Sequence, residues 1–257
     1  MTDTAVRGAA SSDAKRKFYS WMAITCLAVA IIGFMPTYFL PMVQGRFQAP
    51  PIIHIHGAVF FAWTALFCVQ TFLVANGATL AHRTWGLLGI AIATSMVFLV
   101  LATVVVRINM MDAAGYGAGM RAFSWVQVSG IVFFATVFAI AIVYLKKPEI
   151  HKRLMLLGTI SLLDAPIARW FLTFLAPPPP LEGPPPPPPV FVSVPPAMVA
   201  DLFLIAAIVF DWRTRGRPHP VYLIGGGVLL LLQLTRVPVS ATPLWDSIAA
   251  GIARLGG

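Results

Sequence analysis

The sequence predicts an all-α, polytopic membrane protein with seven transmembrane helices. Three observations lead to this fold class: the apolar composition, the spacing of the apolar segments and the placement of the basic residues. Of the 257 residues, 58% are hydrophobic and only 11% are charged, and the mean hydropathy is +0.83. A soluble domain carries roughly a quarter charged residues. We therefore expect the core of this chain to be buried in a lipid bilayer.

Seven apolar segments are each close to the ~20 residues that cross ~30 Å of hydrocarbon as a helix. They follow a polar, basic N-terminal tail over residues 1–18. The first segment lacks a small-residue cleavage site, so we expect a retained span. Cys26 and Cys68 lie inside separate segments and are expected to act as small hydrophobic residues. The segments, which form a transmembrane domain over 19–240, cover residues 19–40, 55–75, 85–106, 123–145, 154–175, 190–211 and 220–238.

The basic residues predict the orientation of these spans. If the N-terminus is cytoplasmic, twelve Lys and Arg residues face inward and three face outward. Because cytoplasmic loops carry the excess of basic residues, we expect a bacterial inner-membrane protein with its N-terminus cytoplasmic and its C-terminus periplasmic. The same placement accounts for the net charge of +9, so nucleic acid is not expected as a partner. The inward set is Arg7, Lys15, Arg16, Lys17, Arg83, Lys146, Lys147, Lys152, Arg153, Arg213, Arg215 and Arg217, and the outward set is Arg46, Arg107 and Arg121.

Two external segments flank the last spans. The loop over residues 176–189 holds ten of the 22 prolines. This composition predicts a stiff polyproline II spacer, and the alternative is a strand that docks into an aromatic groove of a partner. In the tail, 241–257, Thr242 is placed to cap a helix whose first residue is Pro243. We expect this amphipathic helix to lie on the outer membrane surface. Its predicted apolar face consists of Trp245, Ile248, Ile252 and Leu255.

An internal repeat organises the spans as one leading helix and three helical hairpins. The stretch GAVFFA at 57–62 recurs as GIVFFA at 130–135. Each copy is followed by a histidine that opens the next helix, in HRTWGLLG at 82–89 and HKRLMLLG at 151–158, with a weaker third copy, HPVYLIGG, at 219–226. A parallel repeat of this kind is found in some transporters.

The repeated histidines, His82, His151 and His219, lie at the cytoplasmic starts of their helices beside basic residues. One interpretation is a b-type haem held between His82 and His151, as in four-helix cytochromes. A second is a cationic rim that contacts lipid headgroups or phosphate. A third is a purely structural role, in which Gly89 and Gly158, seven residues after their histidines, allow close helix packing.

The outer half of the protein carries a second group of polar residues. His54 and His56 open span two in PIIHIHG, and an HxH pair can ligate a metal ion. Span five contains Asp164 near the bilayer midplane, roughly 15 Å from Leu154 at 1.5 Å per residue. Pro166 lacks an amide hydrogen and crowds the carbonyl of Leu162, which predicts a kink beside Asp164.

Three further charges lie near these residues: Arg169 in span five, Asp201 near the midplane of span six, and Arg236 at the outer end of span seven. Each charge costs on the order of 2.5–3.5 kcal/mol to insert, so we expect these groups to face one another inside the bundle. They form either structural ion pairs or a water-accessible pocket that binds a divalent metal or small ligand, or relays protons. The ligand or metal candidates are His54, His56, Asp164 and Asp201, and the charge partners are Arg169 and Arg236.

The stretches HIHGAVFFAW, AHRTWGLLG and PEIHKRLMLLGTISLLDAPIAR resemble a family of bacterial seven-span membrane proteins that carry HxHG and HKRLMLL motifs. The similarity covers most of residues 50–240, with the proline-rich loop as a local insertion. The resemblance implies the topology and marks residues, without implying a reaction. Seven-span zinc hydrolases of the ceramidase and adiponectin-receptor kind carry HxxxH on their last span, and microbial rhodopsins carry a lysine there. The stretch VYLIGGGVLLLLQLTRV has neither.

Three functional classes remain open from the sequence. The first is an intramembrane metal or ligand site in the outer half, with or without catalysis. The second is a b-type haem redox protein that uses His82 and His151. The third is a non-catalytic accessory subunit of a membrane complex, whose buried charges are structural. Gln70 and Gln127 are expected only to hydrogen-bond between helices.

The orientation can be measured directly. We predict that a reporter active only outside the cytoplasm, fused after residue 257, gives a signal, while a reporter active only in the cytoplasm is silent there. A cytoplasmic signal at this position would contradict either the number of spans or their direction.

Overall fold

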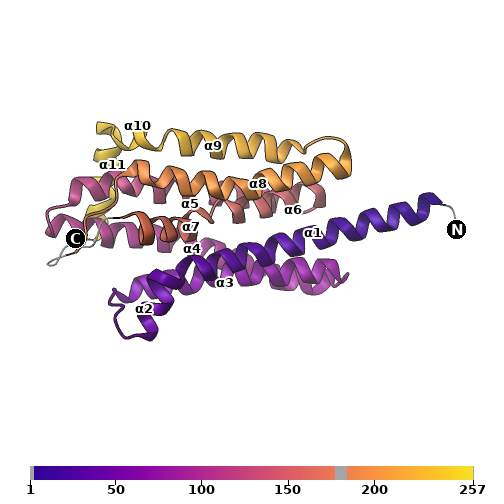
Figure 1. The fold of residues 1–257 in the computed structure, drawn as a ribbon, viewed down its shortest axis with the longest axis horizontal. Helices are drawn as coiled ribbons and strands as arrows, with labels where there is room; N and C mark the ends of the chain where they lie inside the picture. Colours follow the sequence, from indigo (N-terminus) through magenta and orange to yellow (C-terminus); the bar gives the residue numbers. More distant parts are fainter. Residues whose placement is uncertain (1–2, 177–183, 257) are drawn as a thin grey trace.

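The computed structural model describes residues 3–176 and 184–256, with side chains from Lys17 onward, and these residues form only helices and their connections (Figure 1). Six helices are long and apolar enough to cross a membrane, so the chain is a multi-pass membrane protein. A shorter apolar stretch, Val221–Leu234, follows them. The main elements are α1 Asp3–Phe34, α2 Leu40–Val43, α3 Pro51–Ala75, α4 Thr79–Ala113, α5 Gly117–Val143, α6 Pro148–Ile160, α7 Asp164–Leu175, α8 Val194–Arg215, α9 Gly226–Leu234, α10 Arg236–Ser240 and α11 Pro243–Ala253.

The long helices lie side by side along the longest axis of the molecule, and the two termini lie at its opposite ends (Figure 1). Along the chain, α3 packs against α4, α4 against α5, and α5 against α6. Helix α1 packs against α3 and α7, and α8 packs against α7 and α9. The basic N-terminal tail is part of α1 from Asp3 onward. Within the proline-rich loop, the stretch PPPPLEG at 177–183 lies outside the described residues.

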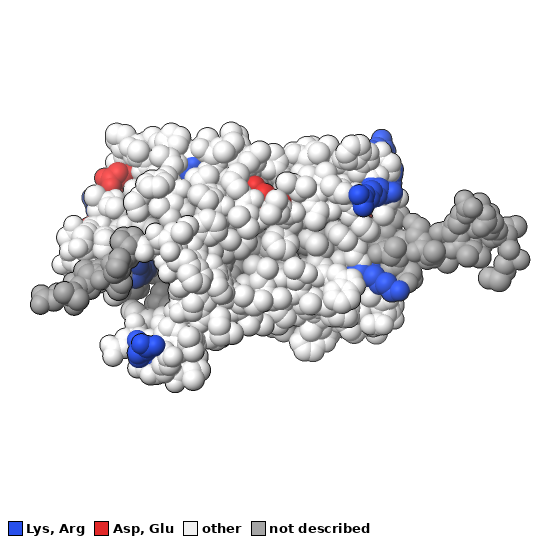
Figure 2. Space-filling model, in the orientation of Figure 1, with Lys and Arg blue, Asp and Glu red and all other residues white. Residues whose placement is uncertain are grey.

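The two ends of the bundle differ in charge. We use the term basic end for the one that carries Lys17, Arg83, Lys146 and Lys147, and far end for the one that carries Asp112, Arg121 and Asp246. Figure 2 shows Lys and Arg side chains gathered where α1 leaves the bundle, and few charges along its length. This separation leaves the middle of the bundle apolar on its outer surface, as the lipid-facing part of a membrane protein must be.

Three interruptions break the helical runs. The segment 161–163 separates α6 from α7, a 3-10 turn (η2, Val190–Ser193) precedes α8, and Thr235 separates α9 from α10. At the first interruption the amides of Leu162 and Leu163 donate to carbonyls only three residues back, at 3.2 and 2.9 Å. Pro166 has no amide hydrogen and crowds the preceding turn, which explains this tightening. The predicted kink in span five is therefore confirmed.

The tail helix α11 begins as predicted. The hydroxyl of Thr242 accepts a hydrogen bond from the amide of Trp245 at 3.2 Å, with Pro243 at the first helical position. The indole nitrogen of Trp245 donates to the carbonyl of Arg121 at 2.8 Å, and its ring lies 4.9 Å from that of Trp125. These contacts dock α11 onto α5 at the far end.

Helix α11 buries one face against the bundle and leaves part of its predicted apolar face exposed. Trp245, Ala249 and Ala253 are buried against α4 and α5, whereas Ile248 and Leu255 are exposed. The prediction placed Trp245 with Ile248, Ile252 and Leu255 on the face toward the membrane surface, and Trp245 instead packs against the bundle. The two alanines allow the helix backbone to approach α5 closely, so the small residues, with Trp245, form the contact.

Helix α1 passes the interruption in span five at very close range. A Cβ atom on Gly33 would collide with the side chain of Pro166 and would lie 2.6 Å from the carbonyl oxygen of Pro166. By contrast, a Cβ atom on Gly57, in α3, would meet nothing within 4 Å. Glycine is therefore required at 33 by the approach of α7, while position 57 has room for a side chain.

We predict that Gly33→Ala lowers the free energy of unfolding by about 1–3 kcal/mol, because the added methyl group overpacks the contact with Pro166. The matched control Gly57→Ala should leave stability unchanged or raise it by up to about 1 kcal/mol. Thermal unfolding of both variants in detergent measures this difference. Equal stabilities of the two variants would mean that α1 does not contact Pro166.

Candidate functional site

One buried guanidinium joins all three helix interruptions. Arg236, the first residue of α10, is 4% exposed and donates to the carboxylate of Asp164, the first residue of α7, at 2.6 Å. It also donates to the main-chain carbonyl of Ser193, at the end of η2, at 2.9 Å. These residues are far apart in the sequence and lie on three different elements, α7, η2 and α10. We call Asp164, Ser193, Asp201, Gln233 and Arg236 the broken-helix site.

The local structure favours each contact. The first turn of an α-helix presents unpaired amides and a partial positive charge, which stabilise the carboxylate of Asp164 at the start of α7. Arg236 also reaches the carbonyl of Ser193, where η2 meets α8, and a carbonyl oxygen has two lone pairs with which to accept hydrogen bonds. Irregular backbone at membrane depth is tolerated where such partners exist inside the protein.

Asp201 lies beside this ion pair but has a weaker partner. The side-chain amide of Gln233 donates to one of its carboxylate oxygens at 3.2 Å, and the charges of Arg236 and Asp164 act on it. Two buried polar atoms of the site have no partner: the Nε of Arg236 and the Oε1 of Gln233. The site therefore contains two carboxyl groups and one guanidinium, and its hydrogen bonding is incomplete.

The other predicted site residues lie away from the carboxylates. The Nδ1 of His54 is 3.0 Å from the hydroxyl of Tyr38. His56 stacks on Phe60 with ring centres 4.3 Å apart, and its Nδ1 is buried without a partner. Among residues 3–176 and 184–256, no three His, Cys, Asp or Glu side chains lie close enough to hold a metal ion. The structure thus brings Asp164 and Asp201 near one another but does not bring His54 and His56 to them.

Arg169 does not pair with an aspartate, so that alternative for the ion pairs is wrong. Its guanidinium lies over the ring of Phe34, in α1, at 5.4 Å. Five residues along an α-helix correspond to about 140° of rotation, so Asp164 and Arg169 leave α7 in different directions. Of the two arginines considered, Arg236 is the one that contacts Asp164.

Two of the three rim histidines meet. The rings of His82 and His151 have centres 6.4 Å apart and are nearly perpendicular, at 82°. His219 instead accepts a hydrogen bond on Nδ1 from the amide of Val221 at 3.2 Å, within its own turn. Burial lowers the pKa of His219, and the nearby charges of Arg153 and Arg215 lower it further. His219 is therefore a neutral element of the loop between α8 and the last apolar helix.

A second buried ion pair, near the basic end, was missed by the sequence reasoning. Arg153 and Asp211 have side chains that are 2% and 1% exposed, joined by two hydrogen bonds of 2.7 and 2.5 Å. Arg153 also donates to the carbonyl and the carboxylate of Glu149, each at 2.7 Å. The sequence alone predicts that Arg153 lies at the cytoplasmic rim, because it is close to other basic residues. Its donors and the carboxylate of Asp211 occupy one another, so this pair clamps α6 to α8.

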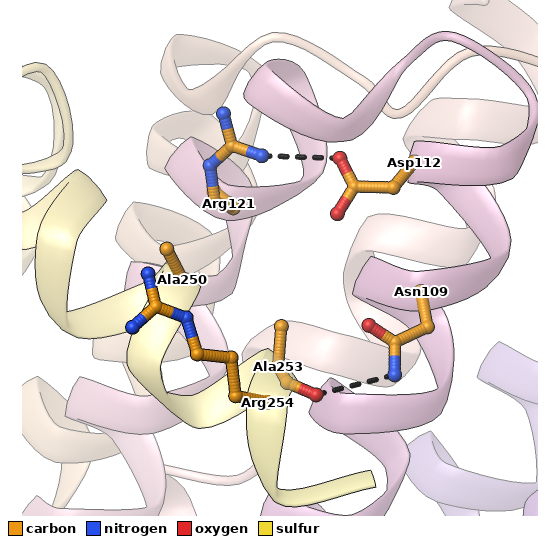
Figure 3. A pocket seen from close by; sticks show the side chains of 6 residues that line it. All are labelled: Asn109, Asp112, Arg121, Ala250, Ala253 and Arg254. Carbon is orange, nitrogen blue, oxygen red and sulfur yellow. Dashed lines mark hydrogen bonds and ion pairs between the residues drawn. The ribbon is translucent and has the colours of Figure 1, made fainter. Parts of the chain in front are cut away.

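A surface pocket of about 410 Å³ lies at the far end, where α11 meets α4 and α5 (Figure 3). On one side of it Arg121 binds Asp112 at 3.0 Å, and on the other Asn109 donates to the carbonyl of Ala253 at 3.2 Å. Arg121 also binds Asp246, of α11, at 2.6 Å. These contacts attach the tail helix to the bundle, so Arg121 and the two aspartates at this pocket are already paired with one another.

The pairing of Asp164 with Arg236 can be tested by a double-mutant cycle. We predict a coupling energy of about 1–3 kcal/mol between Asp164→Asn and Arg236→Gln, since each single change leaves the other charge unpaired in a low-dielectric region. The control cycle of Asp164→Asn with Arg169→Gln should be additive within about 0.5 kcal/mol. Unfolding free energies in mixed micelles measure both cycles. Coupling to Arg169 and additivity with Arg236 would contradict the geometry described here.

Comparison with protein-family models, curated protein sequences and solved structures gives no match for this chain. The resemblance to a bacterial seven-span family therefore stays a prediction from the sequence motifs. What the chain does is inferred below from the positions and contacts of its own residues.

Proposed function

We propose that this multi-pass membrane protein is a proton-exchanging protein of the carrier type, which binds and releases one proton at Asp201. The observation that carries the proposal is the composition of the broken-helix site. Two carboxyl groups share a single guanidinium there, and the strong contact of Arg236 goes to Asp164. Within the part of the chain that the structure describes, Asp201 is left with the amide of Gln233 as its one hydrogen-bonded side-chain partner.

The charge balance favours a bound proton. With both carboxyl groups ionised, the site would hold one uncompensated negative charge at membrane depth, which costs on the order of 2.5–3.5 kcal/mol. A proton on Asp201 removes this charge. A metal ion fits less well, because Arg236 is close enough to repel it and because the nearest group, the amide of Gln233, presents a donor to Asp201.

The surrounding backbone supports a site that changes state. Ion and substrate sites of secondary transporters lie where transmembrane helices are discontinuous, near the bilayer midplane. Here the interruptions at 161–163 and at Thr235, together with the turn η2, converge on Arg236. The unpartnered Nε of Arg236 and Oε1 of Gln233 give a polar ligand or water a donor and an acceptor in the same place.

The remaining parts of the proposal concern topology. The last apolar run, α9 with α10, is taken as a seventh, interrupted span, and the termini lie at opposite ends of the bundle as an odd number of spans requires (Figure 1). The Lys and Arg side chains at the basic end support a cytoplasmic N-terminus in a bacterial inner membrane (Figure 2). The broken-helix site then lies toward the periplasmic side.

Infrared difference spectroscopy tests the protonation of Asp201. At neutral pH we expect a carbonyl-stretching band from one protonated carboxylic acid, which disappears in Asp201→Asn. The band should persist in Asp246→Asn, because Asp246 is exposed and paired with Arg121. The proposal fails if the wild-type protein has no such band, or if the band survives in Asp201→Asn.

A further inference from the structure

The histidine pair near the basic end forms a second site, separate from the broken-helix site. His82 and His151 are both the fourth residue of their helices, α4 and α6, and helix α5 packs against both of these helices. Their ring centres lie 6.4 Å apart, with the ring planes nearly perpendicular, although the residues are 69 positions apart. Neither histidine has an acidic partner among the described residues. The pair is therefore not explained as part of an ion pair.

The separation of the rings matches two imidazoles on opposite sides of a metal ion. A metal–nitrogen bond of about 2.0–2.1 Å and about 1.1 Å from a ring nitrogen to the ring centre place the centre roughly 3.2 Å from the metal. Two rings in a linear arrangement are then about 6.3 Å apart, and two rings at a tetrahedral angle about 5.2 Å apart. The observed 6.4 Å corresponds to the linear arrangement.

A hydrogen bond orients the ring of His151 as metal binding requires. The Nδ1 of His151 lies 2.8 Å from the carbonyl of Ala141, so it carries the proton and leaves Nε2 with a free lone pair. Metal-binding histidines commonly donate their second nitrogen to a backbone carbonyl in this way. His82 lies against the backbone of Gln70, and its Nδ1 is buried without a partner.

A further buried atom beside the pair also lacks a partner. The side chain of Gln70 reaches Gly86, one turn after His82, and its Oε1 makes no hydrogen bond. The sequence predicts that Gln70 hydrogen-bonds between helices, but its Oε1 accepts no hydrogen bond. Buried polar atoms are nearly always satisfied, so two unsatisfied ones next to a histidine pair indicate a missing group.

We infer that His82 and His151 bind one transition-metal ion in trans, from opposite sides. This chemistry is shared by two sources: a two-coordinate copper(I) ion and the iron of a b-type haem. The packing favours the free ion. Gly89 and Gly158, two turns beyond the histidines, already have Leu66 and Val137 at 3.5 Å from the position of an added Cβ, and a porphyrin would have to displace these side chains.

Absorption spectra and metal analysis of the purified full-length protein, expressed with copper and with a haem precursor, distinguish a haem from a copper(I) ion. A Soret band that shifts on reduction identifies haem, and metal analysis with a copper(I)-chelator competition identifies the ion. We expect one equivalent of one of them, with binding weakened at least about 100-fold in both His82→Gln and His151→Gln. The control His219→Gln, at the same end but outside the pair, should bind as the wild type does.

A second measurement keeps the inference testable if a variant does not fold. X-ray absorption of the metal-loaded wild-type protein should show two imidazole nitrogens in trans, alone for copper or as axial ligands for haem iron. Equal binding by the wild type and the two variants, absence of both haem and tight copper, or a tetrahedral site would overturn the inference. None of these results bears on Asp201, whose protonation is measured separately.

Discussion

A charge in hydrocarbon has to be neutralised where it lies, and the contact of Arg236 with Asp164 meets this requirement at the broken-helix site. The guanidinium needs several acceptors, and the carbonyls of a continuous helix already accept hydrogen bonds from its own amides. The interrupted helices supply them through Asp164 and the carbonyl of Ser193. The irregular backbone and the buried charge thus depend on each other: without the interruptions Arg236 would lack partners, and without Arg236 the interruptions would leave polar groups unpaired.

The second ion pair, between Arg153 and Asp211, is a contact in which the charged groups are fully paired. Arg153 makes two bonds to Asp211 and two to Glu149, and its side chain is almost completely buried. Breaking a buried pair of this kind typically costs about 3–5 kcal/mol, so it holds α6 and α8 in one arrangement. The broken-helix site differs because two of its polar atoms are unpaired and Asp201 has no cation of its own. The Arg153 pair holds two helices together, whereas the Arg236 pair leaves Asp201 as the group for which we propose a change of charge.

The sequence predicted much of the fold but only part of the site. The apolar segments, the cap at Thr242 and the break before Pro166 are local signals, set by composition and by the chemistry of single residues. The partners of the charges are not local. In the sequence, Asp211 resembles the other charged residues at the ends of helices. Its contact with Arg153 joins residues 58 positions apart, so no local pattern predicts it. The direction in which Arg169 points depends on the placement of α1, which no pattern in α7 encodes.

Hydrogen–deuterium exchange with mass spectrometry tests the central claim, that Arg236 holds three separate interruptions together. In Arg236→Gln, we expect faster exchange in the segments around 161–164, 190–194 and 233–237 at the same time, with α3 and α4 unchanged. This pattern follows because one guanidinium contacts all three segments. Faster exchange confined to 233–237, with the segments around Asp164 and Ser193 protected as in the wild type, would contradict the account.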